Sequence, residues 1–383
     1  MKILMLNYEF PPIGGGAANA NLCLLKQYAG KEDLQIDVLT SAPTPGFVKE
    51  NFSDNITIHK VGIHKKRLHF WRRSEVIEWL IKAGPVYKKL IKENNYELAH
   101  AFFGFPTGWL SYRNAKKLPY IISLRGSDVP GDNARLQLDY KILGPVFKSI
   151  WTKASGLVAC SGGLKQRAMK FMPYMHVDVI PNGVELDNYY PSNETRGKTD
   201  KIRLITSGRL SATKRVDMLI DAVEILQKKG YKIKFTIAGD GSLSDSLKQL
   251  VSQKNLDSNI EMLGRVEPTN MPELYRASDI YISATMQEGM SNSMLEALAC
   301  GLPVVTTYCE GVEELITNNG IVTKHAHADL LADAIRTLAD NRDTLEQMSI
   351  AARKHAETFS WKNAADKYLG YYKTIIEKAG GSR

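Results

Sequence analysis

The stretch IYISATMQEGMSNSMLEALACGLPVVT, residues 280–306, contains the sequence pattern of a complete β-α-β unit. Its first four residues predict one buried strand and its last three predict a second. Between them, Ser291 or Asn292 is a suitable N-cap for a helix, and Gly301 followed by Pro303 ends that helix. Two strands joined by a helix run parallel, so the stretch predicts an α/β protein with a covered parallel sheet.

The same alternation of strands and helices extends outward from this stretch in two series. The first series begins at Lys2 and the second at Arg203. Glu185–Asp200, which separates them, is polar, has no apolar period and is interpreted as a domain linker. A chain of 383 residues is also long for one core. We therefore expect two Rossmann-like, doubly wound domains facing across a cleft, residues 1–185 and 186–360.

The individual elements can be placed from their apolar runs. A helix is expected over Ser74–Glu93, with Ser74 as its cap and a kink at Pro85. The last helix is expected over Trp361–Lys378. Strands are expected at Lys2–Asn7, Gln35–Thr40, Ile56–Val61, Leu98–Phe102, Tyr120–Leu124, Gly156–Cys160, Arg203–Thr206, Lys234–Ala238, Ile260–Leu263, Ile280–Ser283 and Val304–Thr306.

The net charge of +9 favours anionic ligands or an anionic membrane surface. His59–Arg73 holds six Lys or Arg residues and no acid, with Phe70 and Trp71 among them. This segment is either a solvated loop with an aromatic anchor or a contact for an acidic acceptor or a lipid surface. No zinc-finger or RNP1-like pattern supports nucleic acid as a partner. No apolar run reaches the length of a transmembrane helix, and four scattered cysteines indicate a reduced, cytoplasmic protein.

Two glutamates bracket the helix start in the opening stretch. Glu288 precedes the first turn and Glu296 lies about one turn inside it. Backbone N–H groups at a helix start favour a phosphate, and Gly289 permits close approach of a ligand. Because two carboxylates would repel a phosphate, we expect them to accept hydrogen bonds from hydroxyl groups of a sugar and a ribose. Incidental glutamates on an ordinary helix are the alternative.

A basic loop follows the first strand of the second domain. Arg209 and Lys214 lie after Gly208, where two fixed cations would neutralise a departing nucleoside diphosphate. In the first domain, Gly14–Gly16 also follow the first strand, which suits a phosphate or a sugar. Asn19 stands where a dinucleotide fingerprint requires its last glycine, which argues against an NAD-dependent oxidoreductase.

Several single residues are weaker candidates. Arg125 is either a salt-bridged structural residue or a ligand contact, and His100 is either a core histidine or a ligand contact. Asp128 closes the same strand as Arg125. Asp240 either lines the cleft or caps the next helix, and Arg265-Val266 is placed to offer backbone to a nucleobase. No D-x-D sequence occurs, so no metal is expected.

These motifs together resemble the family 4 glycosyltransferases, which are retaining enzymes of the GT-B fold. The resemblance covers nearly the whole chain and is carried by the glycine loop, the glycine-arginine pair with its lysine, and the E-x7-E spacing. It also rests on Pro181–Val184 and Gly239–Gly241. It implies an acceptor-binding N-terminal domain and a donor-binding C-terminal domain. It also implies that the last helix, within residues 361–383, packs back on the N-terminal domain.

The resemblance also implies roles for the candidate residues. Arg209 and Lys214 would hold and stabilise the leaving diphosphate, Glu288 the transferred sugar, and Glu296 the ribose. Arg125 stands where many members have His. It is counted with Arg209, Lys214 and Glu288 as a catalytic residue, as a permanent cation that could not act as a base, and its exact role stays open. His100 and Asp128 would lie on the acceptor side. The remaining donor contacts would be Gly15, Gly16, Asp240, Arg265, Val266, Gly289, Met290, Ser291 and Asn292.

The function expected from the sequence is retaining transfer of a hexose-type sugar. The donor would be a UDP- or GDP-sugar and the acceptor a hydroxyl group, lipid-linked or on a saccharide, in cell-envelope glycan or glycolipid synthesis. No other cofactor is expected. The protein would be cytoplasmic, with contact to the cytoplasmic face of an anionic membrane. The alternatives are a nucleotide-sugar 2-epimerase and a non-catalytic nucleotide-sugar-binding protein.

Overall fold

The computed structural model describes residues 1–68, 70–131, 136–192 and 201–380, and the chain in it divides into two compact units. Unit 1 comprises Met1–Asn182 together with Trp361–Arg383, and unit 2 comprises Gly183–Ser360. The chain therefore enters unit 2 at Gly183, shortly before the predicted boundary at residue 185. The described part of the predicted linker, residues 185–192, belongs to unit 2, and residues 193–200 lie outside the described residues.

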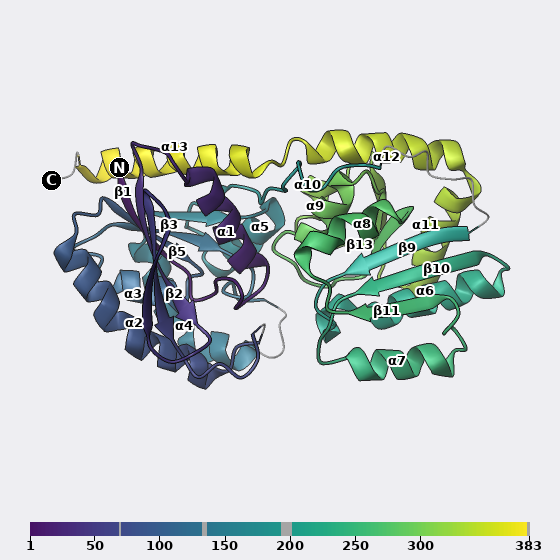
Figure 1. The fold of residues 1–383 in the computed structure, drawn as a ribbon, viewed down its shortest axis with the longest axis horizontal. Coiled ribbons are helices and arrows are strands. Elements are labelled where there is room, and N and C mark those ends of the chain that lie inside the picture. The colour runs from purple at the N-terminus through teal and green to yellow at the C-terminus, as the bar shows by residue number, and fades with distance from the viewer. Residues whose placement is uncertain (69, 132–135, 193–200, 381–383) are drawn as a thin grey trace. The chain divides into compact units, whose positions relative to one another are not determined.

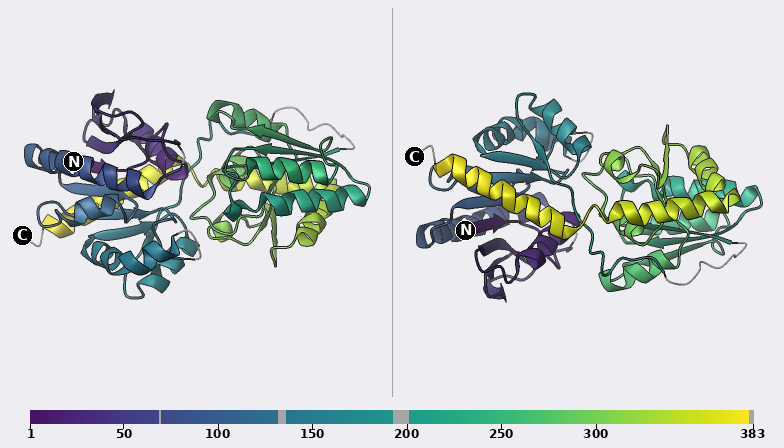
Figure 2. Two further views of the ribbon diagram at one scale, coloured as in Figure 1. Left: turned by 90° about the horizontal axis from the view of Figure 1, so that it is seen from below. Right: turned by 90° about the horizontal axis from the view of Figure 1, so that it is seen from above.

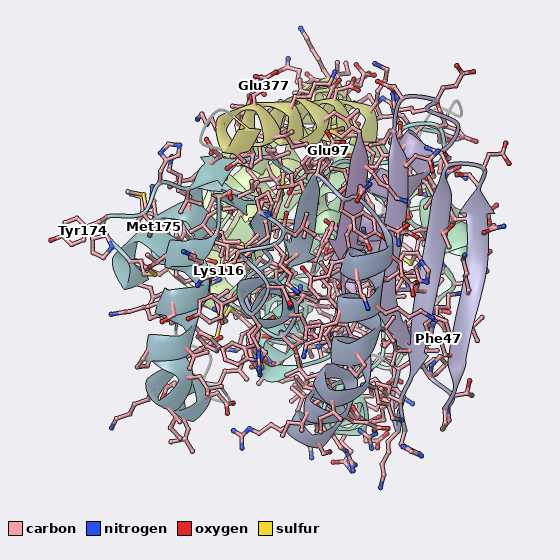
Figure 3. The ribbon with its side chains drawn as sticks, turned by 90° about the vertical axis from the view of Figure 1, so that its left-hand side faces the viewer. Phe47, Glu97, Lys116, Tyr174, Met175 and Glu377 are labelled. Carbon is pink, nitrogen blue, oxygen red and sulfur yellow. The ribbon has the colours of Figure 1, made fainter. Side chains whose placement is uncertain are left out.

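Unit 1 is built on an eight-stranded sheet in the order β3-β4-β2-β1-β5-β6-β7-β8 (Figure 1). All neighbouring strands pair in parallel except β3 and β4, which are antiparallel. The strands are β1 (Lys2–Leu6), β2 (Gln35–Ala42), β3 (Phe47–Ser53), β4 (Ile56–Gly62), β5 (Leu98–Phe102), β6 (Tyr120–Leu124), β7 (Gly156–Ala159) and β8 (Asp178–Val179). The helices are α1 (Gly16–Tyr28), α2 (Arg73–Glu93), α3 (Thr107–Tyr112), α4 (Gln137–Lys153), α5 (Gly162–Phe171) and α13 (Trp361–Gly380). Phe47 and Tyr174 lie near opposite edges of this sheet (Figure 3).

Unit 2 is built on a fully parallel six-stranded sheet in the order β11-β10-β9-β12-β13-β14. Its strands are β9 (Lys201–Ser207), β10 (Lys232–Ala238), β11 (Ile260–Gly264), β12 (Ile280–Ser283), β13 (Val304–Thr307) and β14 (Gly320–Thr323). Its helices are α6 (Val216–Lys228), α7 (Ser244–Gln253), α8 (Met271–Arg276), α9 (Asn292–Ala299), α10 (Val312–Leu315), α11 (Ala328–Asp340) and α12 (Arg342–Ala356), with short 3-10 turns at Ala212–Lys214 and Pro268–Asn270. The apolar faces of α6 and α11 pack with the central strands into one core.

The last helix belongs to the first unit, as the resemblance implied. Helix α13 contacts α1 and lies across unit 1, where it is yellow in Figure 2. Its Trp361, Tyr368 and Tyr372 are buried, and the Tyr28 hydroxyl donates a hydrogen bond to the carbonyl of Ala365 at 3.3 Å. Buried aromatic side chains of this kind contribute much of the apolar area that holds a helix on a domain.

Three strands and one helix cap differ from the sequence predictions. The strands β3, β8 and β14 were not predicted, and β3 is mostly exposed, so it has no alternating apolar pattern. The predicted cap Ser74 lies inside α2, which begins at Arg73. Glu75 draws the helix start earlier, because its carboxylate accepts the backbone N–H of Arg72 at 3.0 Å. Helix α2 runs through Pro85.

Candidate active site

The order in which successive strands are added to the sheet of unit 2 reverses between β9 and β12. Strands β10 and β11 follow on one side of β9, and β12, β13 and β14 follow on the other. In open α/β sheets, ligands bind at the carboxyl ends of the strands at such a switch point. The loops that leave β9 and β12 there carry the basic loop and the glutamate motif, so the fold brings together two motifs that are about 75 residues apart.

Lys214 and Glu288 form an ion pair at this switch point. The backbone holds the two loops together, since the N–H of Met286 donates to the carbonyl of Thr213 at 2.8 Å. The Lys214 ammonium donates to Oε1 of Glu288. Glu288, which is predicted to bind the sugar, and Lys214, which is predicted to bind the diphosphate, are therefore direct neighbours within unit 2.

The environment of Lys214 makes its charge responsive to pH. Burial lowers the pKa of Lys214 to about 8, and the positive charge of Arg209 also lowers it. Arg209 itself is exposed and, among the described residues, makes no hydrogen bond or ion pair. Two cations with little neutralisation beyond Glu288 are suited to binding a polyanion such as a diphosphate.

Helix α9 positions the second glutamate. Ser291 is its N-cap, as predicted, and the Ser291 hydroxyl accepts the N–H of Met294 at 3.3 Å. Glu296 lies inside the helix, where Oε2 accepts a hydrogen bond from the Tyr275 hydroxyl at 3.0 Å. Burial raises the pKa of Glu296 to about 7, and Glu185 also raises it, while the Tyr275 hydrogen bond lowers it.

Tyr275 is a site residue that the sequence analysis missed. It lies on the short helix α8, is fully buried, and also shares a hydrogen bond of 2.7 Å with the Ser207 hydroxyl at the end of β9. It therefore connects Glu296 to the switch point. No motif or spacing in the sequence marks it, because its role depends on how α8 packs beside β9 and β12.

Close backbone packing forms the neighbouring part of the site. A Cβ atom at Gly239 would lie 1.8 Å from the carbonyl oxygen of Gly208, so no larger residue fits between the loops after β9 and β10. Asp240 is exposed, and its Oδ1 accepts from the N–H of Gly241 at 2.8 Å and from the Ser244 hydroxyl at 2.6 Å. Asp240 is not the N-cap of α7, which is Leu243, so the capping role is wrong, and its contact with a ligand stays a prediction.

The remaining predicted donor residues of unit 2 lie on loops at the same edge. Arg265 is exposed and Val266 is partly buried just after β11. Gly289 and Met290 are buried in the loop between β12 and α9, and Asn292 is the first residue of α9. All of them follow the carboxyl ends of strands, which is the geometry that the prediction required.

The glycine loop and Arg125 belong to unit 1, so they are not part of the cluster within unit 2. Gly15 is the N-cap of α1 and Gly16 its first residue. Gly14 has a φ of 100°, and a Cβ there would lie 2.6 Å from the Cβ of Glu9. The loop therefore folds tightly over Glu9, whose carboxylate accepts the N–H of Gly15 at 3.4 Å.

The structure corrects the predicted roles of His100 and Asp128 on the acceptor side. His100 is fully buried between the Tyr372 hydroxyl, 2.7 Å from Nδ1, and the Ser123 hydroxyl, 2.6 Å from Nε2. Burial lowers its pKa well below the usual value, so it is a neutral core histidine. Asp128 is also buried, and its carboxylate accepts the backbone N–H groups of Gly104 at 2.7 Å and Arg125 at 2.8 Å. Both residues support the loops around them from inside the domain.

The basic segment His59–Arg73 is less free than its composition indicates. Lys60 pairs with Glu50, and the buried Lys65 pairs with Glu75 at 2.7 Å and lies 3.9 Å from the centre of a Trp71 ring. Arg73 pairs with Asp139 of α4 at 3.0 Å. The anchored-loop interpretation therefore accounts for half of the six cations. The exposed cations Lys66, Arg67 and Arg72 are left for a partner, and no ion pair of theirs occurs among the described residues.

Residues 1–68, 70–131, 136–192 and 201–380 contain neither a cluster of metal ligands nor a membrane-spanning helix. Within these ranges no three or more His, Cys, Asp or Glu side chains are grouped so that they could hold a metal ion. No helix in them has both the length and the apolar character needed to cross a membrane. The expectation that the chemistry needs no metal stays a prediction.

Known proteins are similar to this chain in both sequence and fold. The family model of group 1 glycosyl transferases matches residues 192–355, and that of Glycosyltransferase Family 4 matches residues 14–188. An uncharacterized glycosyltransferase of Methanocaldococcus jannaschii is 26% identical over 94% of this chain and 95% of its own length. A D-inositol 3-phosphate glycosyltransferase of an Arthrobacter species is 30% identical, but the match covers only 53% of this chain and 51% of that protein.

Two solved structures have the same architecture along the whole chain. Sucrose-phosphate synthase from Thermosynechococcus elongatus superposes with a TM-score of 0.84 at 17% identity, over 99% of this chain and 100% of that chain. HepE from Anabaena, solved in complex with UDP and glucose, superposes with a TM-score of 0.75 at 18% identity, over 98% and 100%. The two structures show that the chain has the GT-B fold. The two family models, which together cover most of the sequence, show that it belongs to the family 4 glycosyltransferases.

Proposed function

We propose that the protein transfers a hexose-type sugar from a UDP- or GDP-sugar to a hydroxyl acceptor with retention of configuration. The observation that carries the proposal is the cluster of Arg209, Lys214 and Glu288 at the switch point of unit 2. The cations would hold and stabilise the departing diphosphate, and Glu288 would accept hydrogen bonds from the sugar. The complexes of HepE with UDP and glucose support a uridine nucleotide as the first donor to test.

Glu296 is proposed to bind the ribose. Its carboxylate is buried and already held by Tyr275, so it is pre-oriented to accept hydrogen bonds from a diol. Neither glutamate is proposed as a general base, because Glu288 is paired with Lys214 and Glu296 faces Tyr275. The leaving phosphate would instead accept the proton of the incoming hydroxyl, so no protein nucleophile and no metal would be needed.

The decisive assay measures release of nucleoside diphosphate from UDP- and GDP-sugars, with and without hydroxyl acceptors. The proposal expects acceptor-dependent release that is lost in Glu288→Ala. Formation of a sugar isomer without acceptor would instead identify a nucleotide-sugar 2-epimerase. Binding of nucleotide sugar without turnover of any acceptor would identify a non-catalytic binding protein. Either result would contradict the proposal of glycosyl transfer.

For the acceptor, we propose a hydroxyl on a saccharide or lipid-linked molecule at an anionic membrane surface, in cell-envelope glycan or glycolipid synthesis. Unit 1 presents a surface that fits such a membrane, which we name the α2–α4 face. It consists of Ile77 and Ile81 on α2 and of Leu138 and Ile142 on α4, all of them more than half exposed. The ion pair between Arg73 and Asp139 joins the starts of the two helices, and helix α3 contacts both.

Charge surrounds the α2–α4 face in the way that an anionic bilayer requires. The same two helices carry the exposed lysines Lys88, Lys89, Lys92, Lys141, Lys148 and Lys153. The acids that lie among the apolar residues are already paired, Glu78 with Lys82 at 2.7 Å and Asp139 with Arg73. Apolar side chains that insert among lipids, with lysines that reach the headgroups, are typical of proteins that lie on a membrane.

Co-sedimentation with vesicles tests this contact. Binding is expected to vesicles that contain phosphatidylglycerol, to be weaker to pure phosphatidylcholine, and to decrease as salt is raised. The double variant Ile81→Ser and Ile142→Ser should reduce it strongly. Ile350→Ser is the matched control, because Ile350 is a similarly exposed isoleucine of unit 2, at 66% against 69% for Ile81. No binding to anionic vesicles, or equal loss in the control, would contradict the membrane contact.

A further inference from the structure

Arg125 is a partly buried arginine of unit 1. It follows β6 directly, and its guanidinium carbon lies 4.7 Å from the centre of the Phe102 ring. Nη1 donates one hydrogen bond to Oδ1 of Asn182 at 2.8 Å. Nε is buried without a partner. Among the described residues, no carboxylate forms an ion pair with this side chain.

The groups around the guanidinium are neutral. His100 is neutral because burial and the charge of Arg125 both lower its pKa. The hydroxyl of Tyr368 is also within reach of that charge, and burial raises the pKa of this phenol. The carboxylate of Asp128 uses its two oxygens for the backbone N–H groups of Gly104 and of Arg125 itself. Within the part of the chain that the structure describes, no carboxylate therefore neutralises the side-chain charge of Arg125.

A structural role alone does not account for this arrangement. Holding Asn182 takes a single hydrogen bond, which a neutral donor could provide without burying a charge. A partly buried charge is costly unless an opposite charge or several hydrogen bonds compensate for it. Arginine presents its N–H groups as a planar fork that matches a carboxylate or a phosphate. The position also suits a ligand, because it lies at the carboxyl end of a strand next to the switch point between β1 and β5.

We propose that Arg125 binds an anionic group, a carboxylate or a phosphate, that belongs to one of the two substrates in addition to the nucleotide diphosphate. This inference rests on the proposed sugar transfer for its two possible sources. The group is carried either by the donor sugar, as in a uronic acid, or by the acceptor. In both cases the fork of Arg125 replaces the hydration of the anion, and Asn182 fixes the orientation of the fork.

The first test measures the anion site without any nucleotide. The full chain carrying Arg209→Ala is used, so that phosphate binds less tightly to the diphosphate site of unit 2, where Lys214 remains. Inorganic phosphate and glucuronate are titrated by calorimetry or ligand-observed NMR, with glucose as the neutral match for glucuronate. Adding Arg125→Gln should weaken binding of both anions at least about tenfold and leave glucose unchanged, whereas Arg125→Lys should cause a smaller loss. Thermal unfolding of each variant establishes that it is folded.

The second test assigns the source in a chain with Arg209 intact. Arg125→Gln is compared on UDP-glucuronate and UDP-glucose, which differ only at C6 of the sugar. Loss of affinity for UDP-glucuronate alone assigns the anion to the donor. No loss for either donor, together with loss of the free anions, assigns it to the acceptor.

Three results would overturn the inference about Arg125. These are anion binding that is equal with and without Arg125, anions that bind no more tightly than glucose, and a tenfold loss of UDP itself in Arg125→Gln. The last would assign Arg125 to the diphosphate. A protein that binds no nucleotide sugar would contradict the proposed function, whereas the first test in the Arg209→Ala chain is decided independently of that outcome.

Discussion

The ammonium of Lys214 and the carboxylate of Glu288 form an ion pair that joins the loops after β9 and β12. The Lys214 ammonium donates a hydrogen bond to Oε1 of Glu288. A nucleotide sugar would change this arrangement, because its diphosphate competes for Lys214 and its sugar hydroxyls compete for Glu288. The pair therefore holds both side chains in place until the donor binds, and its removal should separate the binding of the nucleotide from the chemistry of the sugar.

Replacement of Glu288 should affect turnover much more than nucleotide binding. In Glu288→Ala the sugar loses its hydrogen-bond acceptor, whereas Lys214 is released to the diphosphate. We expect the rate of transfer to fall about 100-fold or more, as is typical when one oriented polar group is removed from an active site. The affinity for UDP should be unchanged or higher. Steady-state kinetics and calorimetry measure the two effects, and an equal loss of UDP affinity and rate would contradict the assignment.

Replacement of Arg209 should weaken binding of the nucleotide directly. Its guanidinium is exposed and unpaired among the described residues, so its removal breaks no contact within the protein. Arg209→Ala should lower the affinity for UDP about tenfold or more with no change in the free energy of unfolding. Arg336→Ala, at an exposed arginine on α11, is the charge-matched control. If both variants weaken the binding of UDP equally, the effect comes from the net charge of the protein and not from a binding site.

The affinity for UDP should be greatest between about pH 7 and pH 8. Below this range Glu296, whose pKa is raised to about 7, becomes protonated and loses its charge-assisted hydrogen bonds to the ribose. Above it Lys214, whose pKa is lowered to about 8, becomes neutral and loses the diphosphate. Titration with UDP at a series of pH values from 6 to 9 measures the acidic and the basic limb of this pH profile of the affinity. Tyr275→Phe removes the hydrogen bond that lowers the pKa of Glu296, so the acidic limb should move to higher pH. An acidic limb that does not move would exclude Glu296 as its source.

The hydrogen bond between His100 and Tyr372 should contribute to stability but not to binding. Tyr372→Phe leaves Nδ1 of His100 buried without its partner, which costs about 1–3 kcal/mol. Denaturant unfolding of the full chain measures this loss, and calorimetry should give an unchanged affinity for UDP because Arg209, Lys214, Glu288 and Glu296 belong to unit 2. A variant of full stability would refute the core role assigned to His100.

The sequence predicted the architecture because its signals are local. Apolar runs fall at nearly all of the long parallel strands, and Ser291 with Gly301 marks both ends of α9. The edge strand β3 could not be found in this way, because its residues are exposed and their pairing with β4 depends on the fold.

The sequence predicted those site residues that lie in a motif directly after a strand. It did not predict the residues whose role depends on packing against distant parts of the chain. Lys214 and Glu288 are each marked by their own loop, but Tyr275 has no local signal. For His100, the choice between a ligand contact and a core residue depends on Tyr372, which lies 272 residues further along the chain. The absence of a neutralising carboxylate beside Arg125, within the described residues, likewise depends on which side chains pack around it.

The central claim is that unit 2 binds a nucleotide sugar through the switch-point cluster, and calorimetric titration of the full chain with UDP- and GDP-sugars tests it most directly. The account predicts saturable binding of at least one of them, with stabilisation of about 2.7 kcal/mol at 100 times the dissociation constant. It also predicts that Arg209→Ala weakens this binding about tenfold or more and that Arg336→Ala does not. No binding of any nucleotide sugar, or binding that is unchanged in Arg209→Ala, would contradict it.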